Sequence, residues 1–199
     1  MIFKCNDTFK RVGKNMALLG EGPVWDESSD TLYWVDIKGR ALHAHRPGSK
    51  IDRRINLPIE VSAVAPRIGG GLIAATRNGF AFLDPQSGRV NQIEDPEAEF
   101  LDNRFNDGTV DNLGNFIAGT MHELETDNTG SVYCLDSQGV VKQLFGRYIV
   151  CNGPAFSPDG CTLYFSNSSE REILAFPYDA GIREVGKPRL FTKITEASG

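Results

Sequence analysis

The sequence predicts an all-β protein, a β-propeller built from four-stranded antiparallel blades of which about four are present. Three observations support this prediction. Similar segments recur roughly 40 to 46 residues apart, which is the repeat length typical of a propeller blade. Each repeat contains short strand-like runs that end in turn sequences, as antiparallel hairpins do. No window of about 11 residues or more shows the apolar period of a helix.

The repeat is clearest in three segments. They read EGPVWDESSDTLYWVDI from Glu21, NDGTVDNLGNFIAGT from Asn106 and NGPAFSPDGCTLYFSNS from Asn152, and a weaker copy begins at Glu60. Each clear copy has a polar residue, a nearby Gly, a turn, and then a run of aromatic and β-branched residues, which is typical of paired strands. We therefore expect a single incomplete propeller domain over residues 1–199, with blades that start near residues 21, 60, 106 and 152.

Further strands follow each of these hairpins in order. They read ALHAHRPGSK and IDRRINL, then FAFLDPQSGRVNQI, then GSVYCLDSQGVVKQLF, and finally ILAFPYDAG. The segment DPEAEFLDN tolerates a helix but is expected to be a loop, and LFTKITEASG is expected to be a connector that leaves the fourth blade. The Asp residues of DESSD, DNLG and SPDG are expected to be structural turn residues. A closed four-bladed ring and a longer propeller cut after its fourth blade both fit this pattern.

Composition narrows the class of protein. The chain has 199 residues, of which 40% are hydrophobic and 24% are charged, as in an ordinary soluble globular protein. The formal net charge of −5 gives no basic surface for nucleic acid or an anionic membrane. We see neither a membrane-length apolar run nor a signal peptide. The four cysteines form no CxxC pair, so we expect reduced thiols and a cytoplasmic protein. They are Cys5, Cys134, Cys151 and Cys161.

A polar side chain stands four residues before the apolar residue of the first strand in each repeat. The polar residues are Glu21, Glu60, Asn106 and Asn152, and the apolar residues are Trp25, Val64, Val110 and Phe156. The first strand of a propeller blade lines the central channel, so equivalent positions form a ring around one axis. Oxygen donors from Glu and Asn, without His or Cys, suit Ca²⁺ or Mg²⁺ better than Zn²⁺. Zn²⁺ remains an alternative because it also accepts carboxylate ligands.

Turn formation is the competing explanation for these polar residues. Glu-Gly-Pro, Asn-Asp-Gly and Asn-Gly-Pro are good turn sequences, but a turn needs only the Gly, and three copies in phase favour the ring. Glu60 lacks a neighbouring Gly and is left out of the predicted site. His43 and His45 alternate in a strand away from the axis and are expected at the surface. His122 and Glu123 follow the strand FIAGTM and are weaker candidates for binding groups at the channel mouth.

Four segments resemble the regucalcin (senescence marker protein), gluconolactonase and luciferin-regenerating enzyme family. They are LGEGPVWDESSDTLYWVDI, NRFNDGTVDNLGNFIAGTM, GSVYCLD and CNGPAFSPDGCTLYFSNS. The resemblance runs from about Leu19 to the C-terminus, and NRFNDG followed by GTM is its most specific feature. It implies a six-bladed propeller that binds one divalent metal ion in its central channel and hydrolyses sugar lactones such as gluconolactone.

The resemblance also implies roles for individual residues. Glu21 and Asn152 would be metal ligands, and Asn106 would be a further ligand or a contact to the metal-bound substrate. Arg104 would bind the sugar lactone, and Asp107 belongs to the same motif. The implied metal is Ca²⁺ or Zn²⁺, with Mg²⁺ and Mn²⁺ as alternatives.

Two features depart from the family pattern. The family's catalytic Asp, also a metal ligand, lies in a PDGMxxD-type segment and is expected beyond Gly199, so no catalytic residue is predicted within this chain. The only PDG, at Pro158-Asp159-Gly160, belongs to a hairpin turn. The glutamate that some members use after GTM is displaced in Met121-His122-Glu123-Leu124. We therefore expect a fragment of a sugar lactonase. The alternatives are a non-catalytic propeller that binds a metal or small molecule, and a four-bladed scaffold for protein partners.

Overall fold

The first two sheets each contain four antiparallel strands in sequence order. The computed structural model describes residues 16–49 and 52–195. The first sheet consists of β1 (Gly20–Asp26), β2 (Thr31–Asp36), β3 (Ala41–His45) and β4 (Arg53–Asn56). The second sheet consists of β5 (Val61–Pro66), β6 (Leu72–Thr76), β7 (Gly79–Leu83) and β8 (Val90–Glu94).

The third and fourth sheets repeat this order, with one addition. The third consists of β9 (Asn103–Val110), β10 (Phe116–His122), β11 (Gly130–Leu135) and β12 (Val141–Tyr148). The fourth consists of β13 (Cys151–Phe156), β14 (Thr162–Asn167), β15 (Glu172–Asp179), β16 (Glu184–Val185) and β17 (Arg189–Lys193). Both β16 and β17 pair with β15. A single 3-10 turn, Ser168–Glu170, separates β14 from β15.

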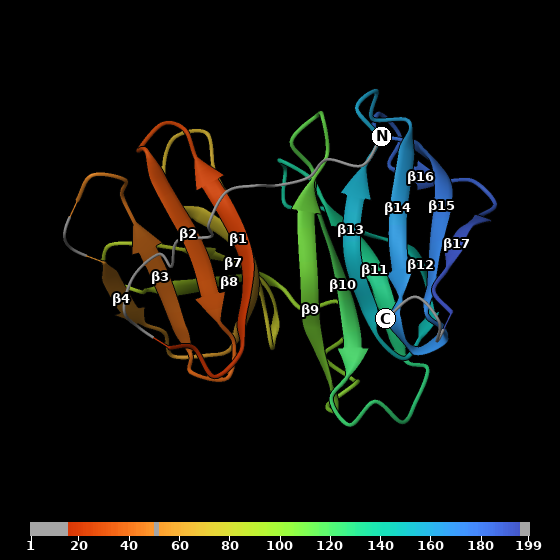
Figure 1. Cartoon of the computed structure of the whole chain (residues 1–199), viewed down its shortest axis with the longest axis horizontal. Helices are drawn as coiled ribbons and strands as arrows, with labels where there is room; N and C mark the ends of the chain where they lie inside the picture. The colour runs from red at the N-terminus through yellow and green to blue at the C-terminus, as the bar shows by residue number, and fades with distance from the viewer. Residues whose placement is uncertain (1–15, 50–51, 196–199) are drawn as a thin grey trace.

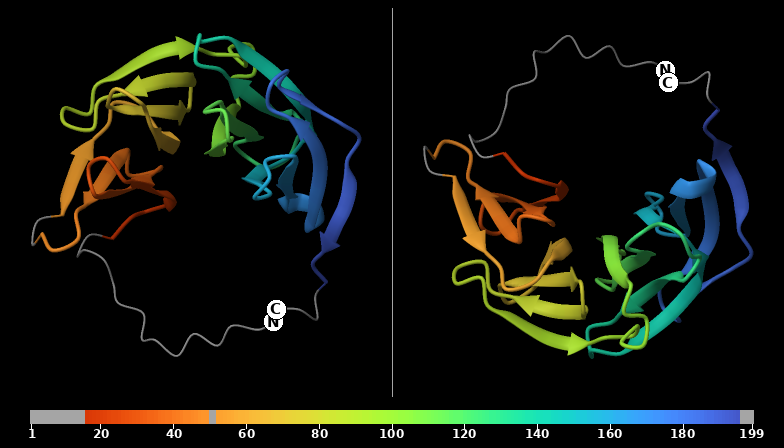
Figure 2. Two further views of the ribbon diagram at one scale, coloured as in Figure 1. Left: turned by 90° about the horizontal axis from the view of Figure 1, so that it is seen from above. Right: turned by 90° about the horizontal axis from the view of Figure 1, so that it is seen from below.

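The four sheets stand side by side like the blades of a propeller, as Figure 1 shows from the side. Seen along the perpendicular direction, they form an open arc around a common axis (Figure 2). Strands β1, β5, β9 and β13 are innermost, and each contacts the innermost strand of the neighbouring blade. The all-β propeller prediction is confirmed, and the described residues form an arc of four blades and not a closed four-bladed ring.

Hydrophobic side chains hold the blades together in three separate layers. One layer joins the first and second blades, a second joins the second and third, and a third joins the third and fourth. Phe80 of the second blade packs against Phe105 of the third, with ring centroids 4.7 Å apart. Burial of apolar side chains between sheets is the main favourable contribution to such a fold. The second and third blades are therefore packed against a neighbouring blade on both sides.

The Gly of the GTM sequence has a packing reason. A Cβ atom placed on Gly119 would lie 2.6 Å from the Cβ of Cys151 on the neighbouring blade. Any side chain at this position would push β10 and β13 apart. The close approach of the third and fourth blades near the axis therefore depends on this glycine.

The hairpin turns confirm the structural role expected for their Asp residues. Asp26, Asp111 and Asp159 each accept hydrogen bonds from backbone N–H groups two residues further along the chain. Asp26 also accepts bonds from the hydroxyls of Ser28 and Ser29, and these bonds, with that of Ser29 the strongest, hold its pKa below the ordinary value. Side chains of this kind close turns without any ligand.

Three local expectations meet different outcomes. The segment DPEAEFLDN forms turns and no helix, as expected. The segment that begins LFTK was expected to be a connector, but Arg189–Lys193 forms strand β17 against β15. His43 was expected at the surface and is only 1% exposed, because it stacks on Trp34 with ring centroids 5.0 Å apart. His45 is partly exposed, with its Nδ1 atom 2.6 Å from a carboxylate oxygen of Asp52.

The described cysteines Cys134, Cys151 and Cys161 are free thiols. Burial raises the pKa of Cys134 to about 11, so this thiol is held in its protonated, unreactive form. Cys5 and the N-terminal segment considered for a signal peptide lie outside the described residues, apart from the last few residues of that segment. Within the described part of the chain, no helix has the length and apolar character needed to cross a membrane.

Candidate functional site

The four innermost strands are irregular at one common level, near their starts. The irregularities lie between Glu21 and Val24 in β1, at Ser62 in β5, at Asn106 in β9, and between Asn152 and Ala155 in β13. Such bulges redirect side chains and are frequent next to binding sites. In β1 and β13 the bulge contains a glycine with positive φ, Gly22 at 56° and Gly153 at 54°, which other residues adopt only at a cost. We call this position the bulge level and define it by Glu21, Ser62, Asn106 and Asn152.

The second blade contributes Ser62 to the bulge level, and the alignment on Glu60 was wrong. In the hairpin register, Pro66 takes the place that Trp25 holds in the first blade, whereas Val64 was aligned there. Four residues before Pro66 stands Ser62, and Glu60 lies outside the strand. Pro66 and Val64 are both apolar, so the sequence pattern alone could not separate the two registers.

Hydrogen bonds at the bulge level join the neighbouring blades. The Ser62 hydroxyl donates to the backbone carbonyl of Phe105 at 2.7 Å. The side-chain amide of Asn106 donates to the carbonyl of Cys151 at 3.0 Å. The second, third and fourth blades are thus connected by polar contacts at the depth where Glu21, Asn106 and Asn152 lie. The bulge level is therefore a joint between blades as well as a candidate site.

The three predicted metal ligands keep different amounts of free oxygen. Glu21 is exposed, and its carboxylate makes no hydrogen bond or ion pair with any residue the structure describes. The Oδ1 atom of Asn106 accepts one long contact, 3.4 Å from the guanidinium of Arg104. The Oδ1 atom of Asn152 accepts the N–H of Gly153 at 2.9 Å and, as a carbonyl-type oxygen, retains a second lone pair. The three side chains come from three different blades.

Arg104 is buried at the edge of this level, only 6% exposed. Its Nε atom donates to Glu123 at 2.9 Å, and its Nη1 atom donates to the carbonyl of Phe105 at 3.0 Å. A guanidinium held at both ends presents its remaining N–H groups in a fixed direction. The structure therefore brings Arg104 and Asn106, the two predicted substrate-binding residues, into contact with each other.

Glu123 is the functional candidate that the sequence left open, and it is the centre of an ion network. Its carboxylate lies 2.5 Å from Lys38, 3.0 Å from Arg77 and 2.9 Å from Arg104. Glu60 bridges the first two cations, at 3.2 Å from Lys38 and 3.3 Å from Arg77. Partial burial of Glu123 would raise its pKa, but the Lys38 hydrogen bond and the Arg104 charge outweigh that effect, so the pKa lies below the ordinary value. We call these five residues the ion network.

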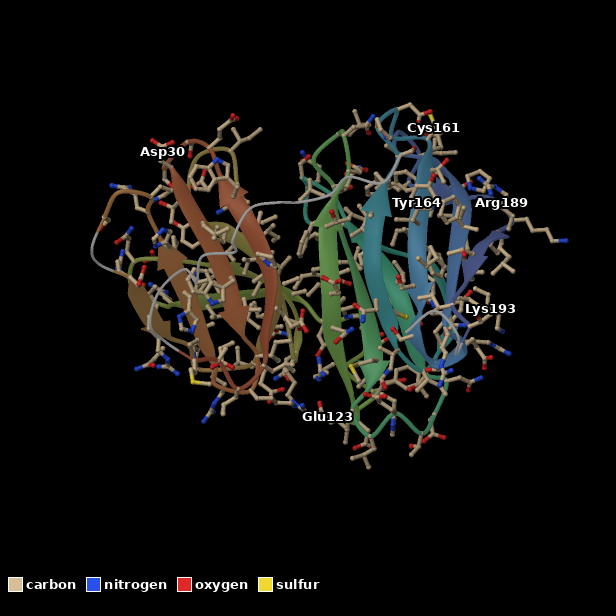
Figure 3. All side chains as sticks on the ribbon, in the orientation of Figure 1. Asp30, Glu123, Cys161, Tyr164, Arg189 and Lys193 are labelled. Atoms are coloured by element: carbon tan, nitrogen blue, oxygen red, sulfur yellow. The ribbon has the colours of Figure 1, made fainter. Side chains whose placement is uncertain are left out.

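The ion network lies at the end of the molecule where β10 finishes, and Figure 3 shows Glu123 there, opposite the end that carries Cys161. Lys38, Arg77 and Glu123 each follow the second strand of their blade within two residues. The network is therefore built from corresponding loops of three successive blades. Since the innermost strands start at the same end, the ion network borders the bulge level.

Asn103, the first residue of NRFNDG, has a structural role that its sequence does not reveal. Its side-chain amide donates to Glu97 at 2.8 Å, and its carbonyl oxygen accepts the Thr129 hydroxyl at 2.7 Å. Glu97 is 7% exposed and also accepts bonds from Thr120 and Tyr133, each at 2.9 Å. Burial raises the pKa of Glu97 in spite of these hydrogen bonds. Asn103 thus anchors the loop that leads into β9.

Asp107 faces a groove of about 560 Å³ that Glu21 also lines. One carboxylate oxygen accepts the N–H of Gly108 at 2.8 Å, and the other accepts the N–H of Gly153 on the neighbouring blade at 2.9 Å. Burial raises the pKa of Asp107, and these two bonds offset only part of that effect. Asn-Asp-Gly is a good turn sequence, but Asp107 lies within strand β9 and links two blades.

His122 makes its side-chain contacts within its own loop. Its Nδ1 atom lies 3.2 Å from the Thr126 hydroxyl, and its Nε2 atom lies 3.6 Å from a carboxylate oxygen of Asp127. These contacts explain the buried imidazole without a ligand. The structure therefore supports a structural role for His122.

The donor set at the bulge level fits a hard divalent cation. Glu21 supplies a carboxylate, and Asn106 and Asn152 supply amide oxygens, which are the ligand types that Ca²⁺ takes. No three His, Cys, Asp or Glu residues in the described part of the chain are placed to hold a metal ion, so a site here depends on the two amide oxygens. Water and substrate oxygens would complete the coordination shell.

The chain resembles proteins of one family in sequence and structure. A model of the SMP-30/Gluconolactonase/LRE-like region matches residues 19–199. The 6-deoxy-6-sulfogluconolactonase of Pseudomonas putida is 32% identical over 197 residues, which is 98% of this chain and 66% of that protein. Regucalcin of Oryctolagus cuniculus is 33% identical over 181 residues, 88% of this chain and 60% of that protein.

A solved structure extends the comparison to three dimensions. The structure of regucalcin from Agrobacterium tumefaciens, described as a calcium-binding protein, has a TM-score of 0.85 with this chain. The two are 32% identical, and the match covers 92% of this chain and 62% of that one. This chain therefore spans about two thirds or less of the length of these relatives.

Proposed function

The chain belongs to the SMP-30/Gluconolactonase/LRE-like family, and from this premise we propose that it functions in the hydrolysis of sugar lactones with a divalent metal ion. The observation that carries the proposal is the arrangement at the bulge level. Glu21, Asn106 and Asn152 stand at corresponding positions of the innermost strands of three blades, and the buried guanidinium of Arg104 contacts Asn106. The lactonase name of the Pseudomonas putida relative and the calcium-binding description of the Agrobacterium structure agree with this arrangement.

Different residues of this chain would bind the metal ion and the sugar lactone. Glu21 and Asn152 would hold the cation, and Asn106 would hold either the cation or the substrate bound to it. When bound, a divalent cation polarises a lactone carbonyl and stabilises the negative charge that develops on its oxygen. Arg104 would donate hydrogen bonds to sugar hydroxyls and so orient the ring. The bond between Arg104 and Glu123 fixes the direction of that donor.

Asp107 serves this arrangement as a positioning residue. Both of its carboxylate oxygens are occupied by backbone N–H groups, which keep the bulge of β13 in place against β9. That contact sets where Asn152, the residue before Gly153, presents its side chain. Among the described residues we assign no general base.

Isothermal titration of the chain with Ca²⁺, Mn²⁺ and Zn²⁺ tests the metal site, and proton release from gluconolactone by the intact gene product tests the chemistry. We expect one divalent ion per chain. Glu21→Gln should weaken its affinity by about tenfold or more, because loss of a charged ligand costs more than about 1.4 kcal/mol. Glu27→Gln, in the hairpin turn after β1, is the matched control and should leave the affinity unchanged.

The outcomes separate the lactonase from its alternative. Metal-dependent release of acid from gluconolactone supports the hydrolase. Metal binding at Glu21 without any such release by the intact gene product favours a non-catalytic propeller that binds a metal or small molecule. If no divalent ion binds, or if Glu21→Gln binds it as well as the unmodified chain does, the proposed site is wrong.

A further inference from the structure

The ion network carries more positive than negative charge. Lys38, Arg77 and Arg104 face only two carboxylates, those of Glu60 and Glu123. Arg40 adds another cation to a hollow of about 430 Å³ that Lys38, Glu60 and Arg77 also line. A surplus of positive charge at the rim of a concave site attracts anionic groups. The chain as a whole has a net charge of −5, so this surplus is local.

Arg77 is the partly exposed guanidinium of the network, and it has hydrogen-bond donors that the network does not use. Its Nη1 atom serves both Glu60 and Glu123, at 3.3 and 3.0 Å. Its Nε and Nη2 atoms have no hydrogen-bond partner among the described residues, and its side chain is 36% exposed. It lines the hollow with Lys38 and Arg40 and also a second hollow that Arg104 lines. A planar guanidinium with two open donor nitrogens, Nε and Nη2, matches the paired oxygens of a carboxylate, sulfonate or phosphate.

Arg77 also lies close to the proposed substrate site. The same oxygen of Glu123 accepts Arg77 at 3.0 Å and Arg104 at 2.9 Å. Arg104 in turn contacts Asn106 at the bulge level. One carboxylate group therefore separates Arg77 from the side chain that would hold sugar hydroxyls. A substituent at the far end of a six-carbon lactone can reach across this spacing.

We propose that Arg77 and Lys38 bind a negatively charged substituent of the lactone, so that the preferred substrates are anionic sugar lactones. The inference rests on the proposed function and adds the substrate class to it. A purely structural network is the competing explanation. Exposed ion pairs contribute little to stability, and a purely structural network does not require the open donors of Arg77.

The test compares four open-chain sugar acids, which resemble the hydrolysis product and are not consumed. The probes are gluconate, gluconate 6-phosphate, 6-deoxy-6-sulfogluconate and glucarate, titrated into the chain in the presence of Ca²⁺ at low ionic strength. The last three differ from gluconate by a phosphate, a sulfonate and a second carboxylate. We expect at least one of them to bind about tenfold more tightly than gluconate, and its identity names the substituent.

Two substitutions assign the preference to its residues. Arg77→Gln should remove most of the preference, measured in each variant as the ratio of the affinity for the charged acid to the affinity for gluconate, so that any change passed to Arg104 through Glu123 affects both acids alike. Lys38→Gln should remove a smaller part. Lys142→Gln is the matched control, because Lys142 is similarly exposed and pairs with Glu184 at 2.9 Å on a different face. Thermal unfolding checks that all three variants are folded.

The results distinguish the inference of an anion site at Arg77 from the lactonase proposal on which it rests. Equal affinity for all four acids, or a preference that survives Arg77→Gln, overturns the inference and leaves the lactonase proposal standing. A preference for the charged acids without any hydrolysis of gluconolactone or its charged analogues overturns the lactonase proposal but keeps the anion site. Absence of binding by every acid overturns the inference.

Discussion

Strands β5 and β9 are the innermost strands of neighbouring blades, yet they differ in burial and in the side chains that they present at the bulge level. β5 reads VSAVAP and is buried over nearly its whole length, whereas β9 reads NRFNDGTV and becomes partly exposed from Asn106 onward. At the bulge level β5 has Ser62, whose short side chain is directed at the Phe105 carbonyl. β9 has Asn106, whose amide reaches the next blade while its oxygen stays available. The same repeat position can thus serve blade packing alone or also offer a free side-chain oxygen, depending on which residue occupies it.

The largest expected difference concerns the residue just before the bulge. Phe105 and Val61 pair with equivalent threonines, Thr120 and Thr76. Both Phe105 and Val61 are only 1% exposed. Phe105→Ala should lower the free energy of unfolding by about 3 to 5 kcal/mol, because it leaves a cavity beside Phe80. Val61→Ala removes two methyl groups and should cost about 2 kcal/mol. Urea unfolding of both variants measures the difference, and equal losses would contradict the packing described here.

The bulge residues themselves should separate stability from binding. Asn106→Ala should weaken Ca²⁺ binding by about tenfold or more if its oxygen is a ligand. Ser62→Ala should leave Ca²⁺ affinity unchanged and cost about 1 kcal/mol of stability, because the Phe105 carbonyl keeps its bond from Arg104. Calorimetric titration and urea unfolding of each variant provide the two measurements. A similar loss of affinity in both variants would show that blade contacts, and not ligand oxygens, govern the metal site.

The loop before β9 contains Glu97, whose titration should make the stability of the chain depend on pH. Because burial raises the pKa of Glu97 above its ordinary value of 4.5, the folded chain keeps this proton to a higher pH than the unfolded chain. The contribution of Glu97 to stability is therefore present below about pH 4.5 and is lost as the pH rises toward the raised pKa.

Glu97→Gln removes this titration and keeps the shape of the side chain. The variant should lose less stability than the unmodified chain between pH 4.5 and pH 7, measured by urea unfolding at several pH values. Glu99→Gln, in the same loop, is the matched control and should follow the unmodified chain. If Glu97→Gln shows the same pH profile as the unmodified chain, the raised pKa is wrong.

The smallest effect is expected for Glu60, which lies just before β5. Glu60→Gln weakens two ion pairs that are partly exposed, so the cost in stability should be at most about 1 kcal/mol. Its effect on Ca²⁺ affinity should stay below about twofold, since Ser62 and not Glu60 stands at the bulge level. A loss of affinity as large as that of Glu21→Gln would restore the discarded alignment.

Much of the fold could be predicted because its signals are local and repeated. Turn sequences such as DESSD and SPDG satisfy their own backbone groups, and the repeat spacing sets the blades. The edges were less predictable. The segment that forms β17 was expected to be a connector that leaves the last blade. The sequence alignment placed Val64 where the structure has Pro66, an error of two residues in the register of β5. The register error arose because Val64 and Pro66, two positions apart, are both apolar and give equally good alternating patterns.

The sequence by itself determined the propeller class, its family and the polar residues at the head of three repeats, since each depends on residues close together in the chain. The tertiary structure alone decided what those residues touch. It placed Arg104 against Asn106, gave Asn103 its buried partner Glu97, and gathered Lys38, Arg77 and Glu123 from three blades into one network. The ion network joins residues from 17 to 85 positions apart, and even the close pairs Arg104–Asn106 and Asn103–Glu97 meet only because the strand and loop turn those side chains toward each other.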